Sequence, residues 1–324
     1  MRRRFVAVAA AAALVALAGC SADGHVVDDE TPLETAAHPV VGLSQAATVL
    51  SAVDAGLVRN RGVTTVKKAD DRVIGPYRDI ALADNRVAAK LKRKAPSAGT
   101  FTPVRLLVPL GAGWPRYFVA VGEVSGESTP SLRVLRSTSA RDPYGLWAQA
   151  SMLPGATLPQ VASPSTGATA LPADATSGLA MSPAKALSGY AAYLNSRGGT
   201  AGFKRSSYSD QVIGGYVSTR KRLSKVATVT SRHRAMSGAP VAIRTTDGGA
   251  VVIGELEQTY TLKTKNNRAV QLTDKQLQAL AGGKKAFGKT FTRTSVEVIV
   301  LYVPRSGDVT VVAAQKGDVK AVAK

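Results

Sequence analysis

Apolar residues recur every three or four positions in two stretches of the chain, which is the period of one buried helix face. The first stretch predicts a helix over residues 44–58 with Ser44 as its N-cap, and its apolar face comprises Ala46, Val49, Leu50, Val53, Leu57 and Val58. The second predicts a helix over residues 182–194, where Ser182 is the cap and Pro183 takes the first helical position. The apolar face of this helix comprises Ala186, Leu187, Tyr190, Ala191 and Leu194.

Other stretches alternate apolar with polar residues, or are apolar throughout, as is typical of β-strands. Strands are predicted over residues 116–124, 131–136, 146–153, 241–245, 250–261, 292–303 and 309–314. The turn Thr246-Asp247-Gly248-Gly249 indicates a hairpin between two of them. A short helix is predicted over residues 273–280.

Each half of the chain therefore places a helix before an antiparallel meander, which is an α+β pattern. The stretch 163–178 is rich in Ser, Pro, Gly, Thr and Ala and shows neither apolar period. We therefore predict a first α+β domain over residues 42–163, a linker over 164–177 and a second α+β domain over 178–324. The repeated order suggests a duplication.

The N-terminus has the pattern of a secretory signal, because three arginines precede an apolar stretch over residues 5–17 that is too short to span a bilayer. It ends in Leu17-Ala18-Gly19-Cys20, which resembles the bacterial lipobox. Cys20 is the only cysteine. We therefore predict a lipoprotein signal peptide over residues 1–19, cleaved between Gly19 and Cys20, and a diacylglyceryl and palmitate anchor on Cys20. An acidic tether over residues 20–41 would then hold the folded part at the extracytoplasmic face of the cell membrane.

Charge is the most informative feature of the remaining chain, and the formal net charge of the full sequence is +20. Residues 44–163 hold 16 Lys and Arg against 8 acids, and residues 178–324 hold 23 against 8. This excess predicts attraction to an anionic envelope component or an acidic protein. The candidate binding residues are Arg220, Lys221, Arg222, Lys225, Arg232 and Arg234. Nucleic acid is not an expected partner, because aromatic residues are few and are not interleaved with the basic runs.

Catalytic patterns are sparse. His25 and His38 fall in the tether, and His233 lies between Arg232 and Arg234, which favours a surface position. With Cys20 lipidated, no thiol is left for catalysis, and we expect no metal site, no cofactor and no enzymatic activity. An unfavoured alternative is a penicillin-binding hydrolase, whose elements are echoed in Ser182-x-x-Lys185, Ser209-Asp210-Gln211 and Lys289-Thr290-Phe291. Ser182 is already explained as a helix cap.

Several of these features together resemble actinobacterial envelope lipoproteins: the lipobox, the acidic tether, the Trp114–Phe118 strand, the Arg244–Ala250 hairpin and Val303-Pro304. The helix-then-sheet halves resemble the cone-shaped NTF2/cystatin-like fold, which often encloses a pocket. Bulky residues that could line such a pocket are Trp114, Tyr117, Trp147 and Tyr190, although core packing is the more common role for each. We expect a non-enzymatic binding or scaffolding module with a basic surface, and, as the alternative, a small-ligand carrier.

Overall fold

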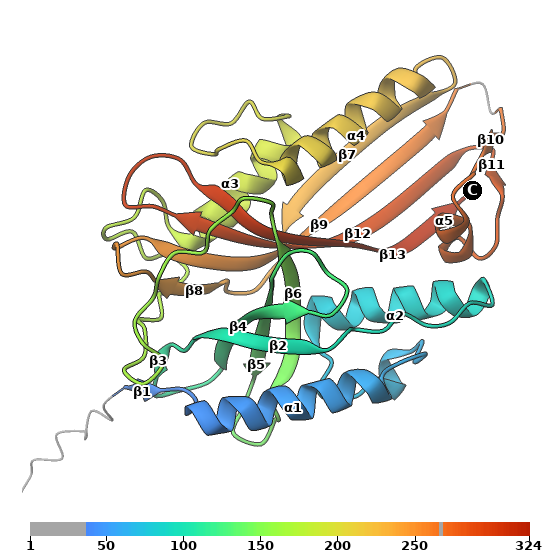
Figure 1. Cartoon of the computed structure of the whole chain (residues 1–324). Helices are drawn as coiled ribbons and strands as arrows, with labels where there is room; N and C mark the ends of the chain where they lie inside the picture. The colour runs from blue at the N-terminus through green and yellow to red at the C-terminus, as the bar shows by residue number, and fades with distance from the viewer. Residues whose placement is uncertain (1–36, 266–267) are drawn as a thin grey trace, which may run out of the picture. The chain divides into compact units, whose positions relative to one another are not determined.

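The computed structural model of the protein describes residues 37–265 and 268–324, so the predicted signal peptide, Cys20 and most of the tether lie outside the described residues. The described chain is α+β and is built on a nine-stranded antiparallel sheet with the order β2-β4-β5-β6-β13-β12-β9-β7, in which β8 pairs with β9 (Figure 1). Within the described ranges, none of the helices is long and apolar enough to cross a bilayer.

The first half comprises two main helices and the strands that follow them. Its elements are β1 (His38–Pro39), α1 (Leu43–Arg59), a short 3-10 helix (Val66–Lys68), α2 (Gly75–Lys90), β2 (Phe101–Leu107), β3 (Leu110–Gly111), β4 (Arg116–Val124), β5 (Ser131–Ser137) and β6 (Gly145–Met152). The apolar face of α1 lies on this half of the sheet, where Ala46 and Val53 are fully buried with Phe118, Leu135 and Leu146.

The second half repeats the order of two helices followed by strands. Its elements are α3 (Pro183–Asn195), α4 (Ser207–Leu223), β7 (Ala227–Ala235), β8 (Val241–Arg244), β9 (Ala250–Thr264), β10 (Val270–Gln271), α5 (Lys275–Leu280), β11 (Ala286–Phe287), β12 (Thr290–Val303) and β13 (Thr310–Ala323). Helix α3 packs closely on β9, because Gly254 has no Cβ where the Leu187 side chain sits.

The two halves of the sheet pack face to face. Val251 and Ile253 of β9 face the strands of the first half, whereas Val252 and Leu256 of the same strand face α3. Because successive side chains of a strand point to opposite faces, β9 contributes to two cores, one between the sheet halves and one under the helices. The resulting layers are α1, the first-half strands, the second-half strands and α3.

One short pairing makes this a single sheet. Ala313 and Ala314 of β13 pair with Met152 and Ser151 of β6. The α+β class is therefore confirmed, but tandem NTF2-like domains are not, because strands of both halves share hydrogen bonds. The proposed linker also lies on strands of both halves, since Pro109 bridges Ala168 and Ala170 bridges Ile243. The division at residues 164–177 stays a prediction.

Most predicted elements lie where they were expected, with two kinds of difference. Helix α1 is capped by Gly42 and not by Ser44, since its backbone turns helical two residues earlier. Helices α2 and α4 and strands β2 and β7 lie outside the predicted ranges; the buried residues of α4 are confined to its first turn, and β7 alternates mostly polar residues. Strand β13 continues to Ala323, well beyond its last strongly apolar run.

Candidate functional site

A cleft of about 1090 Å³ opens mainly in the second half. It lies between α4 and the sheet, reaches α2 past β13, and is bounded by α5. The polar side chains that line it include Gln258, Arg293, Lys316 and Asp318 of the sheet, and Asp84 of α2. The apolar wall toward α5 comprises Leu262, Leu272, Leu277, Leu280, Phe287 and Phe291.

Helix α4 roofs this cleft and packs only loosely on the sheet. Its first turn is fixed, because Ser206 and Ser209 form a capping box and Tyr208 is buried. Beyond that turn its apolar side chains, such as Val212, Tyr216 and Leu223, are only partly buried against the cores. The sheet beneath α4 is therefore left partly uncovered, which leaves the volume of the cleft.

A buried polar network lies on the floor beneath α4. His233 Nδ1 is 2.8 Å from Glu297 Oε2, and both side chains are almost fully buried. Lys316 Nζ lies 3.4 Å from the other carboxylate oxygen of Glu297. The backbone amide of His233 donates to Asn195 Oδ1 at 2.8 Å, which ties β7 to the end of α3. His233 is 4% exposed, so the interpretation of it as a surface histidine is wrong.

Gln258 extends the network toward the cleft. Lys316 Nζ donates to Gln258 Oε1 at 2.5 Å, and Gln258 Nε2 donates to Ser231 Oγ at 2.9 Å. Arg293 Nη2 reaches the same Gln258 oxygen at 3.5 Å, and Arg293 Nε lies 3.5 Å from Asp318. That Nε is buried and, among the described residues, its distance to Asp318 is too long for a good hydrogen bond.

Two ionisable groups of the network are shifted by their surroundings. Burial would raise the pKa of Glu297, but the hydrogen bond from His233 and the positive charge of Lys316 outweigh it, so the pKa of Glu297 lies below its usual range. Burial lowers the pKa of Lys316, and the negative charge of Glu297 offsets this only in part. The Glu297 carboxylate is thus held ionised. A further negative charge nearby would stabilise the protonated form of Lys316.

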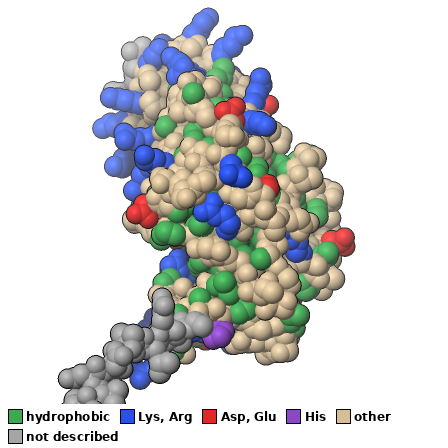
Figure 2. Space-filling model, turned by 90° about the vertical axis from the view of Figure 1, so that its left-hand side faces the viewer, with side chains coloured by type: hydrophobic (Ala, Val, Ile, Leu, Met, Phe, Trp, Pro, Cys, Tyr) green, Lys and Arg blue, Asp and Glu red, His purple; other side chains and the backbone are tan. Residues whose placement is uncertain are grey.

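Cations surround the apolar end of the cleft. The register of β7, β9, β12 and β13 places their ends near Ala227, Thr264, Thr290 and Ala323 together at one end of the sheet. We call the adjoining residues 220–226, 263–290 and 320–324 the basic end. These segments contain 13 Lys and Arg and a single acid, Asp274. On the face drawn in Figure 2, Lys and Arg side chains gather over the upper part of the molecule, which the second half forms, and are fewer lower down.

The predicted basic residues do not share one surface. Arg220, Lys221 and Arg222 are exposed near the end of α4, and Arg222 lines the cleft. Lys225 follows in the loop before β7 and belongs to the basic end. Arg232 and Arg234 are exposed on the opposite face of β7 from His233, and Arg234 pairs with Glu257 at 3.0 Å.

The four predicted pocket aromatics lie in different places, and none lines the cleft. Trp114 is 40% exposed, with the Arg116 guanidinium 4.7 Å from its ring centre. Tyr117 donates from its hydroxyl to the Ala242 carbonyl at 3.1 Å, and Trp147 packs against Gly75 at the start of α2. Tyr190 is fully buried and stacks on Tyr193. The core-packing role therefore fits Tyr190 best.

The serines of the penicillin-binding alternative sit at helix starts. Ser182 is buried at the N-cap position of α3, and Ser209 is buried in the capping box of α4. Lys185 is exposed. Ser209 thus has a local structural role, whereas Ser182 takes the N-cap position without a side-chain cap hydrogen bond.

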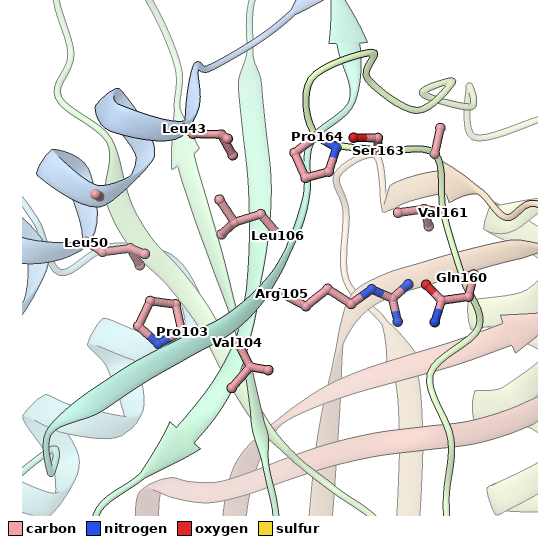
Figure 3. Close-up of a pocket in the computed structure, with 12 residues that line it drawn as sticks. Leu43, Leu50, Pro103, Val104, Arg105, Leu106, Gln160, Val161, Ser163 and Pro164 are labelled. Carbon is pink, nitrogen blue, oxygen red and sulfur yellow. The ribbon is translucent and has the colours of Figure 1, made fainter.

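A second, smaller groove of about 490 Å³ lies in the first half between α1, β2 and residues 160–164 (Figure 3). Leu43, Val104 and Leu106 make it mostly apolar, and Leu43 is 59% exposed. Its one charged residue, Arg105, donates to the carbonyls of Leu158 and Pro159. With that guanidinium already engaged, this groove offers less for a charged ligand than the cleft does.

Comparison with known proteins gives a family. A family model described as "Domain of unknown function (DUF8094)" matches residues 37–323. The chain is 28% identical over 256 residues to an uncharacterized lipoprotein of Streptomyces avermitilis, and the alignment covers 75% of each chain. No solved structure matches the chain. These matches support a family of lipoproteins, and neither supports NTF2-like halves.

Proposed function

The chain belongs to the DUF8094 family, whose description names no activity, and from the cleft we propose that it is a lipid-anchored envelope protein that binds an anionic amphiphile. The observation that carries this proposal is that one cavity combines an apolar wall with a polar part where Arg293 and Lys316 lie beside Asp318. Such a ligand has a negatively charged head and a hydrocarbon part. The proposal adopts the ligand-carrier alternative and moves it from the cone-like halves to the space under α4.

The polar part of the cleft suits a carboxylate or phosphate head. Arg293 has an incompletely bonded guanidinium there, and an arginine fork matches the oxygens of such groups in two-point contact. Lys316 contributes a second positive charge whose pKa is lowered by burial and, in smaller part, by the charge of Arg293. A bound anion would relieve both penalties, so its head would bind more strongly here than at an exposed lysine.

The outer wall suits the hydrocarbon part. Leu277, Leu280 and Phe291 belong to a partly open cluster at the α5 end, where a bound chain would cover apolar surface. Each methylene removed from water contributes about 0.8 kcal/mol. The 13 cations of the basic end would in addition raise the local concentration of anionic ligands.

Fluorescence of cis-parinaric acid, an anionic polyene fatty acid, tests the proposal on residues 37–324. We expect saturable binding of the acid and much weaker binding of its uncharged methyl ester. Arg293→Gln should raise the Kd for the acid by at least about tenfold, because hydrogen bonds to charged groups contribute about 1.5–3 kcal/mol. The matched control is Arg232→Gln, an exposed arginine on the opposite face of the sheet.

Two results would contradict the proposal that the ligand has an anionic head group bound by Arg293. One is equal affinity for acid and ester, and the other is an equal loss in the two arginine variants. If instead Leu43→Asp in the first-half groove abolished binding while Leu277→Asp did not, the ligand would bind in the first-half groove and not in the cleft under α4.

Anchoring at Cys20 is a separate part of the proposal. It rests on the lipobox and on the relative described as a lipoprotein. Feeding a clickable palmitate analogue to cells that express the full chain should label the protein, and Cys20→Ser should abolish the label and release the protein from the extracytoplasmic side of the membrane. Retention of unlabelled Cys20→Ser protein on the membrane would show that something other than the lipid holds it.

A second candidate function is contact with an anionic envelope polymer or an acidic protein through the basic end. The favouring observation is the ratio of 13 cations to one acid there. Reversing Arg220, Lys221 and Arg222 to Glu should weaken association with isolated envelope fractions, and the effect should fade above about 0.5 M salt, where screening is strong. Association that survives the reversal at low salt would exclude this role.

A further inference from the structure

Three side chains beneath α4 have the arrangement of a nucleophile, a base and an orienting carboxylate. Ser231 Oγ lies 3.4 Å from His233 Nε2, and His233 Nδ1 lies 2.8 Å from Glu297 Oε2. Ser231 and His233 are two residues apart on β7, so both point to the same face of the sheet. Glu297 comes from β12, on the far side of β9.

Gln258 fixes which nitrogen of neutral His233 carries the proton. Its Oε1 accepts from Lys316, so its Nε2 is the end that faces His233 Nε2 at 3.3 Å. Because Nε2 of Gln258 can only donate, His233 Nε2 must accept, and the ring proton lies on Nδ1 toward Glu297. This is the tautomer that a general base needs beside a serine.

Ser231 is reachable from outside. It is only partly buried, and with His233 it lines a hollow of about 60 Å³ between the end of α3 and α4. Val212 and Tyr216 of α4 line both this hollow and the large cleft. The loosely packed α4 thus separates the serine from the cleft, and the small hollow admits a short acyl group.

We propose that Ser231, His233 and Glu297 form a site that hydrolyses carboxylic esters of short acyl groups. Ser231 Oγ bonds to the ester carbonyl carbon while its proton passes to His233 Nε2. The carbon–oxygen bond of the ester then breaks, and His233 returns the proton to the departing alcohol. Water attacks the acyl-serine with His233 as base, which releases the acid and restores Ser231. Glu297 is a positioning residue that holds the Nδ1 proton throughout.

Gln258 also supplies a donor for the oxyanion of this reaction. When His233 becomes protonated at Nε2, it can no longer accept from Gln258. The freed N–H, on a nitrogen 2.9 Å from Ser231 Oγ, is then close to the oxygen that becomes negative on the adjacent carbon. Lys316 and Arg293 orient the Gln258 amide for this purpose.

The test is labelling of folded residues 37–324 with a fluorophosphonate probe, followed by intact and peptide mass measurement. We expect one probe per chain, on Ser231, formed with loss of fluoride. Ser231→Ala and His233→Gln should each reduce labelling at least about 100-fold, since general-base assistance contributes about 10²–10⁴-fold. Glu297→Gln should shift the pH profile of labelling as well as its rate. Ser182→Ala is the matched control and should label normally.

Further variants guard against misfolding and separate this proposal from the binding function. Ser231→Cys keeps the size of the side chain, and iodoacetamide should alkylate it faster than Ser182→Cys in a manner that depends on His233. Ser231→Ala should still bind cis-parinaric acid, so loss of one activity does not imply loss of the other. Unlabelled wild-type protein, in a buffer where a known serine hydrolase is labelled, would overturn the proposal, as would labelling that persists in Ser231→Ala.

Discussion

Helices α1 and α4 have the same length, 17 residues, but they cover their halves of the sheet to very different degrees. Helix α1 buries residues along most of its length, from Ala46 to Gly56, against its half of the sheet. Helix α4 buries only Tyr208 and Ser209, in its first turn. Beyond that turn Val212, Tyr216 and Leu223 are only partly buried against the cores, so space beneath the helix remains available to a ligand.

The buried charged groups of the two halves also differ in how they connect to a cavity. In the first half Arg133, fully buried, is held by Asp54 at 2.6 Å and by Gln149 at 2.9 Å, and its guanidinium lies over the Phe101 ring. In the second half the buried pair of His233 and Glu297 continues through Lys316 and Gln258 into the cleft. The first arrangement leaves Arg133 Nη2 without a hydrogen-bond partner among the described residues and meets a hollow of about 200 Å³ through Gln149, whereas the second presents donors to the cleft of about 1090 Å³.

The largest expected difference concerns the helices themselves. Val53→Asp should lower the free energy of unfolding by more than about 4 kcal/mol, because it buries an unpaired carboxylate under α1. Val217→Asp in α4 should change it by less than about 0.5 kcal/mol, since Val217 is exposed. Urea unfolding followed by circular dichroism measures both, and equal losses would contradict the loose packing of α4.

Removal of the buried carboxylate should come next. Glu297→Ala leaves Lys316 and His233 without their acceptor and should cost about 3–5 kcal/mol. The double variant Glu297→Leu with Lys316→Met should recover a large part of this loss, since neither charge is then unpaired. A double variant less stable than Glu297→Ala, measured by the same urea titration, would show that the ion pair is not the source of the cost.

Asp54→Asn in the first half should have a smaller effect, about 1–2 kcal/mol. Asp54 is 38% exposed, so water screens its attraction to Arg133, and Gln149 remains as a partner. A loss as large as that of Glu297→Ala would mean that the two buried charges are equally dependent on one partner. Thermal unfolding of the two single variants side by side makes this comparison.

The smallest effect is on the pH dependence of stability. Because the folded pKa of Glu297 lies below its unfolded value of 4.5, the stability it contributes is present above pH 4.5 and is lost as the pH falls through the folded pKa. Glu297→Gln should therefore flatten the acid limb of a plot of unfolding free energy against pH. Asp54→Asn serves as the comparison, and an unchanged acid limb in Glu297→Gln would contradict the depressed pKa.

The sequence was most informative where the apolar residues follow a single clear spacing. The spacing of Ala46, Val49, Leu50 and Val53 predicts α1, and the pairing of Ser182 with Pro183 predicts the start of α3. The joining of the two halves into one sheet could not be predicted from the sequence, because it depends on two residue pairs between β6 and β13 that no local pattern encodes. Both strands had been predicted, in separate domains.

The site was hidden for two physical reasons. The arginines on either side of His233 suggest a solvated run, yet in a strand they point away from it, and the alternation of Val229, Ser231 and His233 was the signal that marks the buried face. The partners of His233 lie on other strands, and only the register brings Glu297 to it. Helix α4 escaped notice since Gly214 and Gly215 interrupt its few apolar positions.

Hydrogen exchange of residues 37–324, with and without cis-parinaric acid, tests the difference between α1 and α4 most directly. In the free protein, amides of α4 beyond its first turn should exchange faster than those of α1, because the side chains that hold this part of α4 to the sheet are only partly buried. The acid should slow exchange in α4 and α5 and leave α1 unchanged. Equal protection of α1 and α4 in the free protein, or slowing confined to α1 and β2, would contradict a ligand cleft beneath α4.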